Sequence, residues 1–282
     1  MMVIKRKLIV RMMLHCCVVC LLLAESLMAD VTLTRLAASG VIIDDGETRI
    51  MIDGLVVEPY AIYGGLPPEL AQQFSTASGI FADIDLALVS HKHHDHNQPE
   101  FACNFLKTST RTRLVTSIQV IELVRERCRP LVRTSSRVGA IEPGYADPVV
   151  LPVNTAKVTV FILSHGTGKY ERLQNFGHLV DMGGVRILHI GDAAMDATDF
   201  EIAQVANLDL DVALIPFWFF QPGPGFGVVT EFMKARYQLA VQIPPGEMAE
   251  VTEFLAENYP EVRVLAQPGD SIVVSSRESA SE

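Results

Sequence analysis

Four of the eight histidines in this chain lie in one run of six residues, and this run constrains the fold more than any other feature. The run reads His91-Lys92-His93-His94-Asp95-His96. It directly follows a short apolar segment, residues 84–90, whose composition predicts a buried strand that leads into a loop. Side chains on such a loop are held by a rigid element and still face a cleft.

Five of the six residues in this run, all except Lys92, are of types that bind metals. His91 and His93 are two residues apart, so their side chains point to the same side of an extended backbone. Asp95 and His96 follow where the chain must turn. Imidazole and carboxylate groups suit zinc, and also manganese or iron. Because four ligands this close together would crowd one tetrahedral ion, the run predicts two metal ions that share the loop.

The run resembles the His-x-His-x-Asp-His signature of the metallo-β-lactamase-fold hydrolases, and it is most similar to their lactonase- and phosphodiesterase-like branch. The resemblance extends from roughly Val31 to the C-terminus, so we expect residues 30–282 to form one hydrolase domain. It implies an α+β fold, a four-layer αββα sandwich with the metal site at one edge of the two sheets. Strand and helix patterns alone would indicate only an α/β or α+β protein.

Two later residues match ligand positions of the same family. His165 follows an apolar strand pattern at residues 157–163, and Asp192 follows another at residues 185–190. A carboxylate suits a bridging position because its two oxygens can reach two cations. The resemblance implies that the first metal is held by His91, His93 and His165, the second by Asp95 and His96, and that Asp192 lies between them.

Three other polar residues in strand patterns are expected to support the site or the core. Asp53 ends the pattern at residues 49–53, close to where the family places the floor of its metal site. His178 and His189 lie inside strand patterns, where a hydrogen-bonded core histidine is a more frequent role than a ligand.

One ligand of the family is missing. The resemblance implies a final histidine for the second metal, but no histidine follows His189, and Gln242 takes the expected place. An amide oxygen is a poorer zinc ligand than imidazole, so Gln242 is at most a weak ligand. We therefore expect a dinuclear site that binds its second metal more weakly than its first, or a mononuclear site when metal is limiting. The cofactor is one or two Zn²⁺ ions, with Mn²⁺ or Fe²⁺ as alternatives.

The N-terminus has the pattern of a signal peptide. Four basic residues precede or begin an uncharged apolar run at residues 12–23, and Ala29 provides a small residue for cleavage. We expect residues 1–29 to be removed and the protein to be periplasmic or secreted, without stable membrane insertion. An uncleaved N-terminal anchor is the alternative. Without these residues the chain carries 19 basic and 32 acidic residues, a net charge of −13, which argues against nucleic acid as a partner.

The mature chain keeps Cys103 and Cys128, which in an exported protein either pair as a disulfide or remain two buried thiols. Aromatic residues in two loops predict an apolar wall for a substrate pocket. These are Trp218 and Phe219, in a run of four aromatic residues after a strand pattern, and Tyr63, in a long connection before the histidine run.

The function expected from these observations is metal-dependent hydrolysis of a small molecule. A metal-activated water would cleave an ester, lactone, phosphodiester or amide bond, and catalysis would depend on His93 and on Asp95, which takes up a proton. The alternative is a binding protein that kept the fold but lost full metal competence, because of Gln242. The sequence does not support a serine esterase, because it contains no Gly-x-Ser-x-Gly motif. The oligomeric state is left open.

Overall fold

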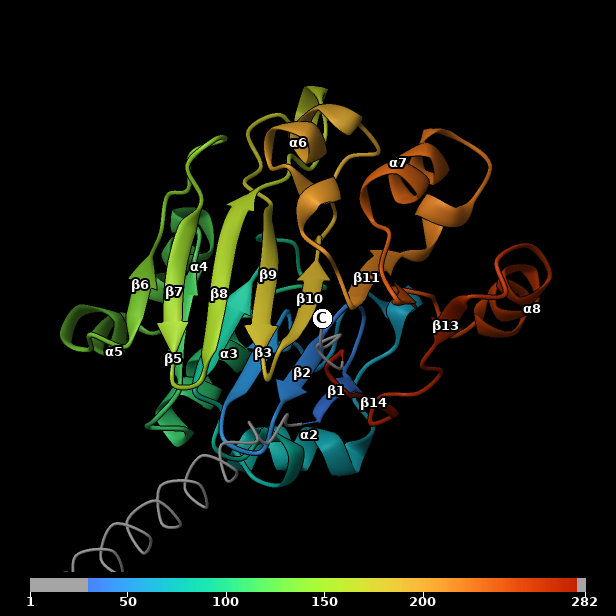
Figure 1. Cartoon of the computed structure of the whole chain (residues 1–282). Helices are drawn as coiled ribbons and strands as arrows, with labels where there is room; N and C mark the ends of the chain where they lie inside the picture. The colour runs from blue at the N-terminus through green and yellow to red at the C-terminus, as the bar shows by residue number, and fades with distance from the viewer. Residues whose placement is uncertain (1–29, 278–282) are drawn as a thin grey trace, which may run out of the picture.

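The computed structural model describes residues 30–277, whose strands form two seven-stranded sheets (Figure 1). The expected signal peptide, residues 1–29, lies outside the described residues. The first sheet has the order β14–β1–β2–β3–β4–β5–β6 and the second the order β13–β12–β11–β10–β9–β8–β7. The strands of the first sheet are β1 (Val31–Arg35), β2 (Val41–Asp44), β3 (Arg49–Ile52), β4 (Leu86–Val89), β5 (Arg113–Thr116), β6 (Val138–Ala140) and β14 (Ser271–Val274). The strands of the second are β7 (Val149–Val153), β8 (Ala156–Ile162), β9 (Phe176–Met182), β10 (Val185–His189), β11 (Val212–Pro216), β12 (Tyr237–Val241) and β13 (Val262–Val264).

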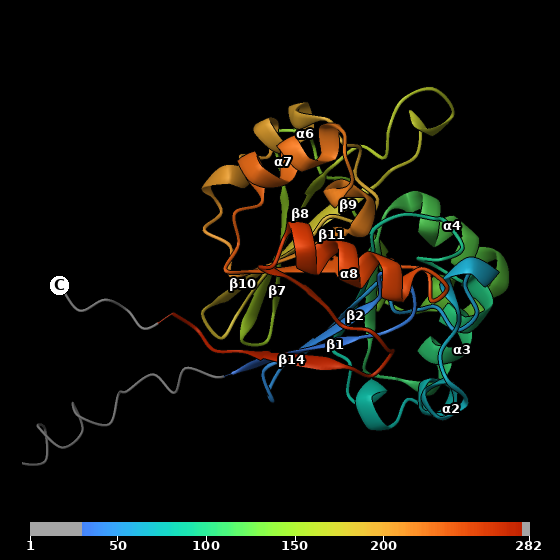
Figure 2. The same ribbon diagram turned by 90° about the vertical axis from the view of Figure 1, so that its right-hand side faces the viewer.

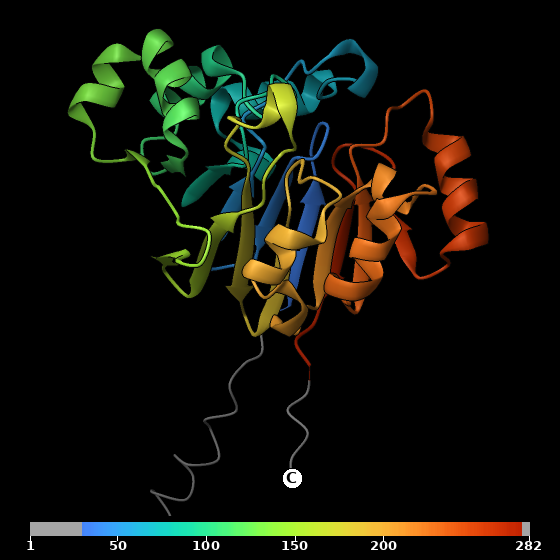
Figure 3. The ribbon, with the colours of Figure 1, turned by 90° about the horizontal axis from the view of Figure 1, so that it is seen from above.

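Helices cover the outer face of each sheet, and Figures 2 and 3 show the two groups on opposite sides of the strands. The helices on the first sheet are α2 (Pro68–Thr76), α3 (Pro99–Thr108), α4 (Ile118–Arg127) and α5 (Arg129–Thr134). Those on the second are α6 (Ala197–Ile202), α7 (Pro224–Phe232) and α8 (Met248–Asn258). Short 3₁₀ helices are η1 (Ala61–Tyr63), η2 (Gly79–Phe81), η3 (Gly168–Tyr170), η4 (Val205–Asn207) and η5 (Phe217–Phe220). The predicted four-layer αββα sandwich is therefore confirmed.

Strand periodicity explains how one short apolar segment packs against two layers. In β4, Leu86 and Leu88 point into the core between the sheets, while Ala87 and Val89 point into the core beneath the helices. Successive side chains of a strand face opposite sides, so a strand covered on both faces must be apolar at every position. The continuous apolar run before the histidines is thus a consequence of the sandwich.

The metal-site loops lie at one edge because several strands run in the same direction. In the first sheet β3 and β4 pair in parallel. In the second sheet β10, β11 and β12 pair in parallel, and β8 runs in the same direction because β9 is antiparallel to both β8 and β10. A hydrogen bond from Phe176 N to Ser90 O, 3.0 Å long, joins the two sheets at this edge. The residues that follow these strands are consequently brought together.

Three elements differ from the sequence patterns. β14 was not expected, since four residues near the C-terminus give little periodicity, yet it pairs antiparallel with β1. The apolar pattern at residues 208–215 predicts a strand there, but β11 begins only at Val212, because η4 and the bend after it occupy the preceding residues. The sequence pattern predicts a helix at residues 228–236, but α7 spans residues 224–232. Pro224 begins it, because the first N–H groups of a helix have no partner within the helix, so proline loses no hydrogen bond there. Among residues 30–277, no helix is long and apolar enough to cross a membrane.

Cys103 and Cys128 form a disulfide, which decides between the two alternatives that the sequence left open. It links α3 to the residue after α4 across 25 positions of sequence. We predict that Cys103→Ala/Cys128→Ala lowers the free energy of unfolding by about 3 kcal/mol, because the unfolded chain loses a loop constraint of this length. Urea unfolding measures the difference. Dithiothreitol should produce a similar loss in the wild-type protein, and a loss below about 1 kcal/mol for the double variant would contradict the prediction.

His178 lies in the core between the sheets, opposite His189 in the β9–β10 pair. Its two ring nitrogens are among the buried atoms that make no hydrogen bond within the described residues. Burial, aided by His189 and opposed by Asp53, lowers the pKa of His178 to about 3. Both core histidines are thus buried as predicted, although His178 lacks the expected hydrogen bond.

This histidine should make the protein sensitive to acid. Below its ordinary pKa of 6.5 the unfolded chain binds a proton at His178, whereas the folded protein does not until about pH 3. Stability therefore falls with falling pH across this window, by about 1.4 kcal/mol per pH unit. Between pH 7 and pH 5, wild-type protein should lose about 2 kcal/mol more than His178→Leu in urea unfolding. Equal losses in the two proteins would refute this account.

Candidate metal centre

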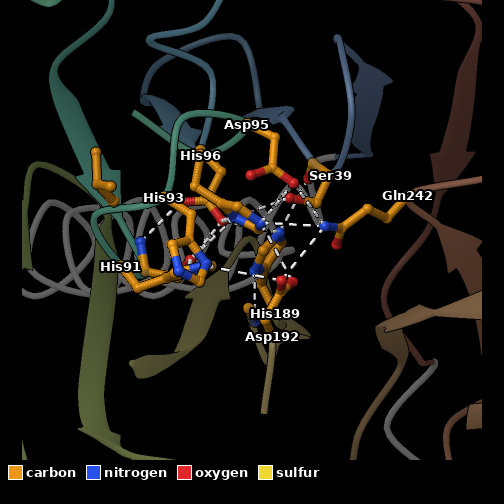
Figure 4. Close-up of polar contacts among 12 residues, drawn as sticks. Ser39, His91, His93, Asp95, His96, His189, Asp192 and Gln242 are labelled. Atoms are coloured by element: carbon orange, nitrogen blue, oxygen red, sulfur yellow. Dashed lines mark hydrogen bonds and ion pairs between the residues drawn. The ribbon is translucent and has the colours of Figure 1, made fainter. Parts of the chain in front are cut away.

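The predicted site residues come together at the strand ends, one to seven positions after each strand (Figure 4). The histidine run follows β4, His165 follows β8, Asp192 follows β10 and Gln242 follows β12. Asp192 is preceded by Gly191 at a φ of 56°, where an added Cβ would lie 2.3 Å from Asn175 Oδ1. Glycine is therefore required here both by the left-handed backbone and by the close approach.

The first group contains three imidazoles and one carboxylate. One ligand atom from each of His91, His93, His165 and Asp192 lies within 4.8 Å of all the others. His91 Nε2 is 2.9 Å from His93 Nδ1, and Asp192 Oδ2 is 3.8 Å from His91 Nε2 and 3.7 Å from His165 Nε2. Ligands about 2.1 Å from a tetrahedral zinc ion lie about 3.4 Å apart. Among residues 30–277, neither buried nitrogen of His165 has a hydrogen-bond partner, which fits a ring whose partner is a cation.

The second group contains Asp95, His96 and the same Asp192. His96 Nε2 lies 3.2 Å from Asp192 Oδ1 and 3.6 Å from Asp95 Oδ2. Gln242 completes this group, since its Nε2 lies 3.0 Å from Asp95 Oδ2, 3.2 Å from His96 Nε2 and 3.4 Å from Asp192 Oδ2. Asp95, His96 and Asp192 offer atoms that suit a cation, but the Gln242 amide directs its N–H group toward the two carboxylates. Asp192 belongs to both groups, as a bridging ligand must.

Asp53 orients the histidines of both groups through hydrogen bonds. This fully buried residue accepts hydrogen bonds of 2.7 Å from Ser90 N, Ser90 Oγ and His96 Nδ1. Ser90 Oγ also lies 3.0 Å from His91 Nδ1. Partners of this kind fix the ring orientation and leave the other ring nitrogen for a metal. Asp53 therefore has the supporting position that the sequence predicted.

Charge at the site favours a bound cation. Burial lowers the pKa values of His91, His93 and His165, so these rings are neutral and offer lone pairs. Burial alone would also lower the pKa of His96, but Asp192 and Asp53 hold it well above its usual range. Burial opposes ionisation of Asp192, yet His96 and the other nearby histidines keep its pKa below its usual range. The first group thus combines three neutral imidazoles with the ionised carboxylate of Asp192, whereas His96 carries a proton that a metal ion in the second group would have to displace.

Two residues that the sequence did not single out position the site. Ser39 Oγ lies 3.1 Å from His96 Nδ1, and His189 Nε2 lies 3.0 Å from Ser39 O. Asn175 is fully buried and donates to Leu163 O and Ile190 O, while its Oδ1 accepts from Asp192 N. Asn175 therefore joins the ends of β8 and β10. The only sequence feature that could have indicated Asn175 is its position as a polar residue directly before a core strand. No sequence feature indicated a role for Ser39.

The predicted aromatic wall is only partly correct. Phe219 is fully buried in the core beneath the helices of the second sheet, so its assignment to the pocket was wrong. Trp218 is half-buried against the same core, because the four aromatic residues form η5 and its turn directs successive rings to different sides. Tyr63 does lie at the site: burial raises its pKa to about 12, with contributions from nearby Asp95 and Asp192.

A cavity of about 520 Å³ opens beside the first group. His93 lies in its wall, together with Tyr60, Lys92, His94 and Arg127 among others. His94 is not part of either ligand group: its Nε2 lies 2.7 Å from Gln98 Nε2, and its ring packs 5.6 Å from that of Tyr60. Four residues of the histidine run, His91, His93, Asp95 and His96, thus belong to the ligand groups. His94, the fifth residue of the run that could bind a metal, lies in the wall of the cavity instead.

Comparison with known proteins identifies the family. The family described as "Beta-lactamase superfamily domain" matches residues 32–218. The chain belongs to this superfamily. No curated protein sequence matches the chain.

Several solved structures share the fold of this chain. Igni18, a metallo hydrolase from Ignicoccus hospitalis, is 16% identical, with a TM-score of 0.59 over 88% of this chain and 100% of that one. An isothiocyanate hydrolase from Delia radicum gut bacteria is 13% identical, with a TM-score of 0.61 over 87% and 100%. CmlA, a diiron β-hydroxylase from Streptomyces venezuelae, is 14% identical, with a TM-score of 0.55 over 88% and 54%. At these identities the likeness concerns the fold alone.

Proposed function

We propose that this protein is a metal-dependent hydrolase of a small molecule. The observation that carries the proposal is the convergence of His91, His93, His165 and Asp192, whose ligand atoms lie within 4.8 Å of one another beside a cavity. Three nitrogens and one carboxylate form a donor set suited to zinc, with manganese or iron as alternatives. The hydrolases among the solved structures with this fold support the same reaction class.

A metal ion bound here would lower the pKa of a bound water toward neutrality and polarise the bond to be cleaved. The chain provides the remaining functions. Asp95 Oδ2, held by the Gln242 amide at 3.0 Å, is placed to take up a proton from the attacking water or to return it to the leaving group. Tyr63 keeps its proton at working pH because its pKa is about 12, so its hydroxyl can donate a hydrogen bond to a substrate oxygen.

The substrate class follows from the site and the surface charge. An ester, lactone, phosphodiester or amide bond can be attacked by a metal-activated water. The chain after residue 29 carries a net charge of −13, which disfavours polyanionic substrates such as nucleic acids. The cavity beside His93 has room for a small organic molecule. A small substrate is therefore the proposed partner.

A panel of ester, lactone, phosphodiester, amide and β-lactam substrates tests this proposal with zinc-loaded protein. His93→Ala is the control, since it removes a ligand of the first group. Turnover of at least one class, abolished in the variant, is the expected result. A zinc-loaded protein that turns over none of them would refute the proposal for these classes.

A binding protein without catalysis is the second candidate, favoured by Gln242 where the family has a histidine. The same panel separates the two candidates, because a binding protein would show saturable ligand binding in calorimetry without turnover.

We also propose that the protein is exported, to the periplasm or the exterior. The disulfide between Cys103 and Cys128 supports an oxidising compartment, since such bonds are rare in the cytosol. Cell fractionation and N-terminal sequencing test this: a periplasmic or secreted chain that begins at Asp30 is expected. A full-length chain in the membrane fraction would instead indicate the N-terminal anchor.

A further inference from the structure

Gln242 is held in an unusual conformation that directs its side chain into the second group (Figure 4). It directly follows β12, is 1% exposed and has a φ of 62°, in the left-handed region. A residue with a side chain is uncommon there, and the conformation costs on the order of 1 kcal/mol. The fold therefore maintains a backbone strain at the position where the amide enters the site.

The terminal amide nitrogen of Gln242 lies within 3.4 Å of one atom of each residue in the second group. Its distances to Asp95 Oδ2, His96 Nε2 and Asp192 Oδ2 are 3.0, 3.2 and 3.4 Å. His96 Nε2 lies at similar distances from the two carboxylates, 3.6 Å from Asp95 Oδ2 and 3.2 Å from Asp192 Oδ1. Ligands of one tetrahedral ion lie about 3.4 Å apart. Gln242 therefore reaches a ligand position.

The two orientations of this amide have opposite effects on a cation. Nε2 donates to two carboxylates, while Oε1 is buried and has no hydrogen-bond partner in the part of the chain that the structure describes. Rotating the amide by half a turn exchanges Nε2 and Oε1 without moving the rest of the side chain. An N–H group repels a cation, whereas a carbonyl oxygen can bind one. The amide can thus close the metal-free site in one orientation and bind a metal in the other.

We propose that Gln242 is a rotating amide ligand that makes the second site select a harder cation than the first. This inference rests on the metal centre of the proposed function. With Oε1 turned inward, the second site has three oxygen donors and one nitrogen, from Asp95, Asp192, Gln242 and His96. The first site has three nitrogens and one carboxylate. Oxygen donors suit Mn²⁺, and imidazoles suit Zn²⁺, so the preference for Zn²⁺ over Mn²⁺ is smaller at the second site.

Sequential metal titration of the full protein tests the proposal. Metal-free protein first receives one equivalent of Zn²⁺. One sample is then titrated with Mn²⁺, and binding is measured as the loss of the free Mn²⁺ signal in electron paramagnetic resonance. A second sample is titrated with further Zn²⁺ in competition with a chromophoric chelator. Wild-type protein is expected to bind a second ion and to discriminate less between Zn²⁺ and Mn²⁺ there. Gln242→His should raise that discrimination about tenfold or more, a change of the size seen when metal-site partners are altered. Gln242→Glu should strengthen Mn²⁺ binding by adding a charge.

Gln238→His is the matched control, because it places a histidine on β12, the strand that Gln242 follows, outside both groups. It should leave both affinities unchanged. Gln242→Glu keeps the test decisive if Gln242→His does not fold. The proposal is overturned if zinc-loaded wild-type protein binds no second ion, or if the Gln242 variants leave the discrimination unchanged. Absence of the first zinc would instead refute the metal centre of the proposed function, and this inference with it.

Discussion

Asp192→Asn should lower kcat/KM by at least about 10³-fold, equivalent to about 4 kcal/mol of transition-state stabilisation. Asp192 is the one residue shared by both ligand groups, and its carboxylate lies 3.2–3.8 Å from His91, His96 and His165. Asparagine keeps the size of the side chain but removes the charge and one of the two oxygens that can face two cations. The variant should therefore lose metal from both groups. Zinc retention after desalting and turnover of the substrate found in the panel measure the effect.

Asp196→Asn is the matched control for this variant. Asp196 is a fully exposed carboxylate whose Oδ1 caps the start of α6 by accepting from Thr198 N. Asparagine caps helices as well as aspartate does, so stability, zinc retention and turnover should not change. If Asp192→Asn retained zinc and kept kcat/KM within about tenfold of the wild type, the assignment of a shared ligand would be wrong.

Asp53→Ala should have the second largest effect, through stability as well as metal affinity. The substitution leaves Ser90 N, Ser90 Oγ and His96 Nδ1 without their acceptor inside the core. Removing the acid from such a buried, charge-assisted network costs about 3–5 kcal/mol of unfolding free energy. Loss of the partner that orients a metal-binding histidine lowers metal affinity about 10- to 100-fold. Urea unfolding of the metal-free protein and zinc competition measure the two effects separately.

Asp53→Asn separates charge from shape at the same position. It keeps one acceptor oxygen and tolerates the φ of 50° better than alanine, so its stability should lie between those of the wild type and Asp53→Ala. A loss below about 1 kcal/mol for Asp53→Ala would show that the network does not stabilise the fold, contrary to this interpretation.

The site could be predicted where local sequence carries the information. His91, His93, Asp95 and His96 follow one apolar strand pattern, and a residue that follows a core strand lies at a sheet edge in any sandwich of this kind. His165 and Asp192 follow the same rule after β8 and β10. Their mutual distances could not be predicted without the resemblance, because strand order is a property of pairing between distant segments.

Features set by long-range packing escaped prediction. Ser39 contacts His96 across 57 residues, and no local pattern indicates that contact. Gln242 contacts Asp95 across 147 residues, and only the family resemblance, not a local pattern, led us to expect Gln242 at the second metal. Phe219 and Tyr63 are both aromatic residues in loops, yet one is buried in the core and the other lies beside the ligand groups. Composition cannot tell these two outcomes apart, since each depends on which helix covers the loop.

Anomalous diffraction at the zinc edge, from crystals of zinc-loaded protein, tests the central claim most directly. The predicted result is a zinc peak bonded to His91 Nε2, His93 Nδ1 and His165 Nε2, with Asp192 beside it, and no such peak in His91→Ala crystals. A zinc peak elsewhere with this site empty, or an undiminished peak at the site in the variant, would contradict it.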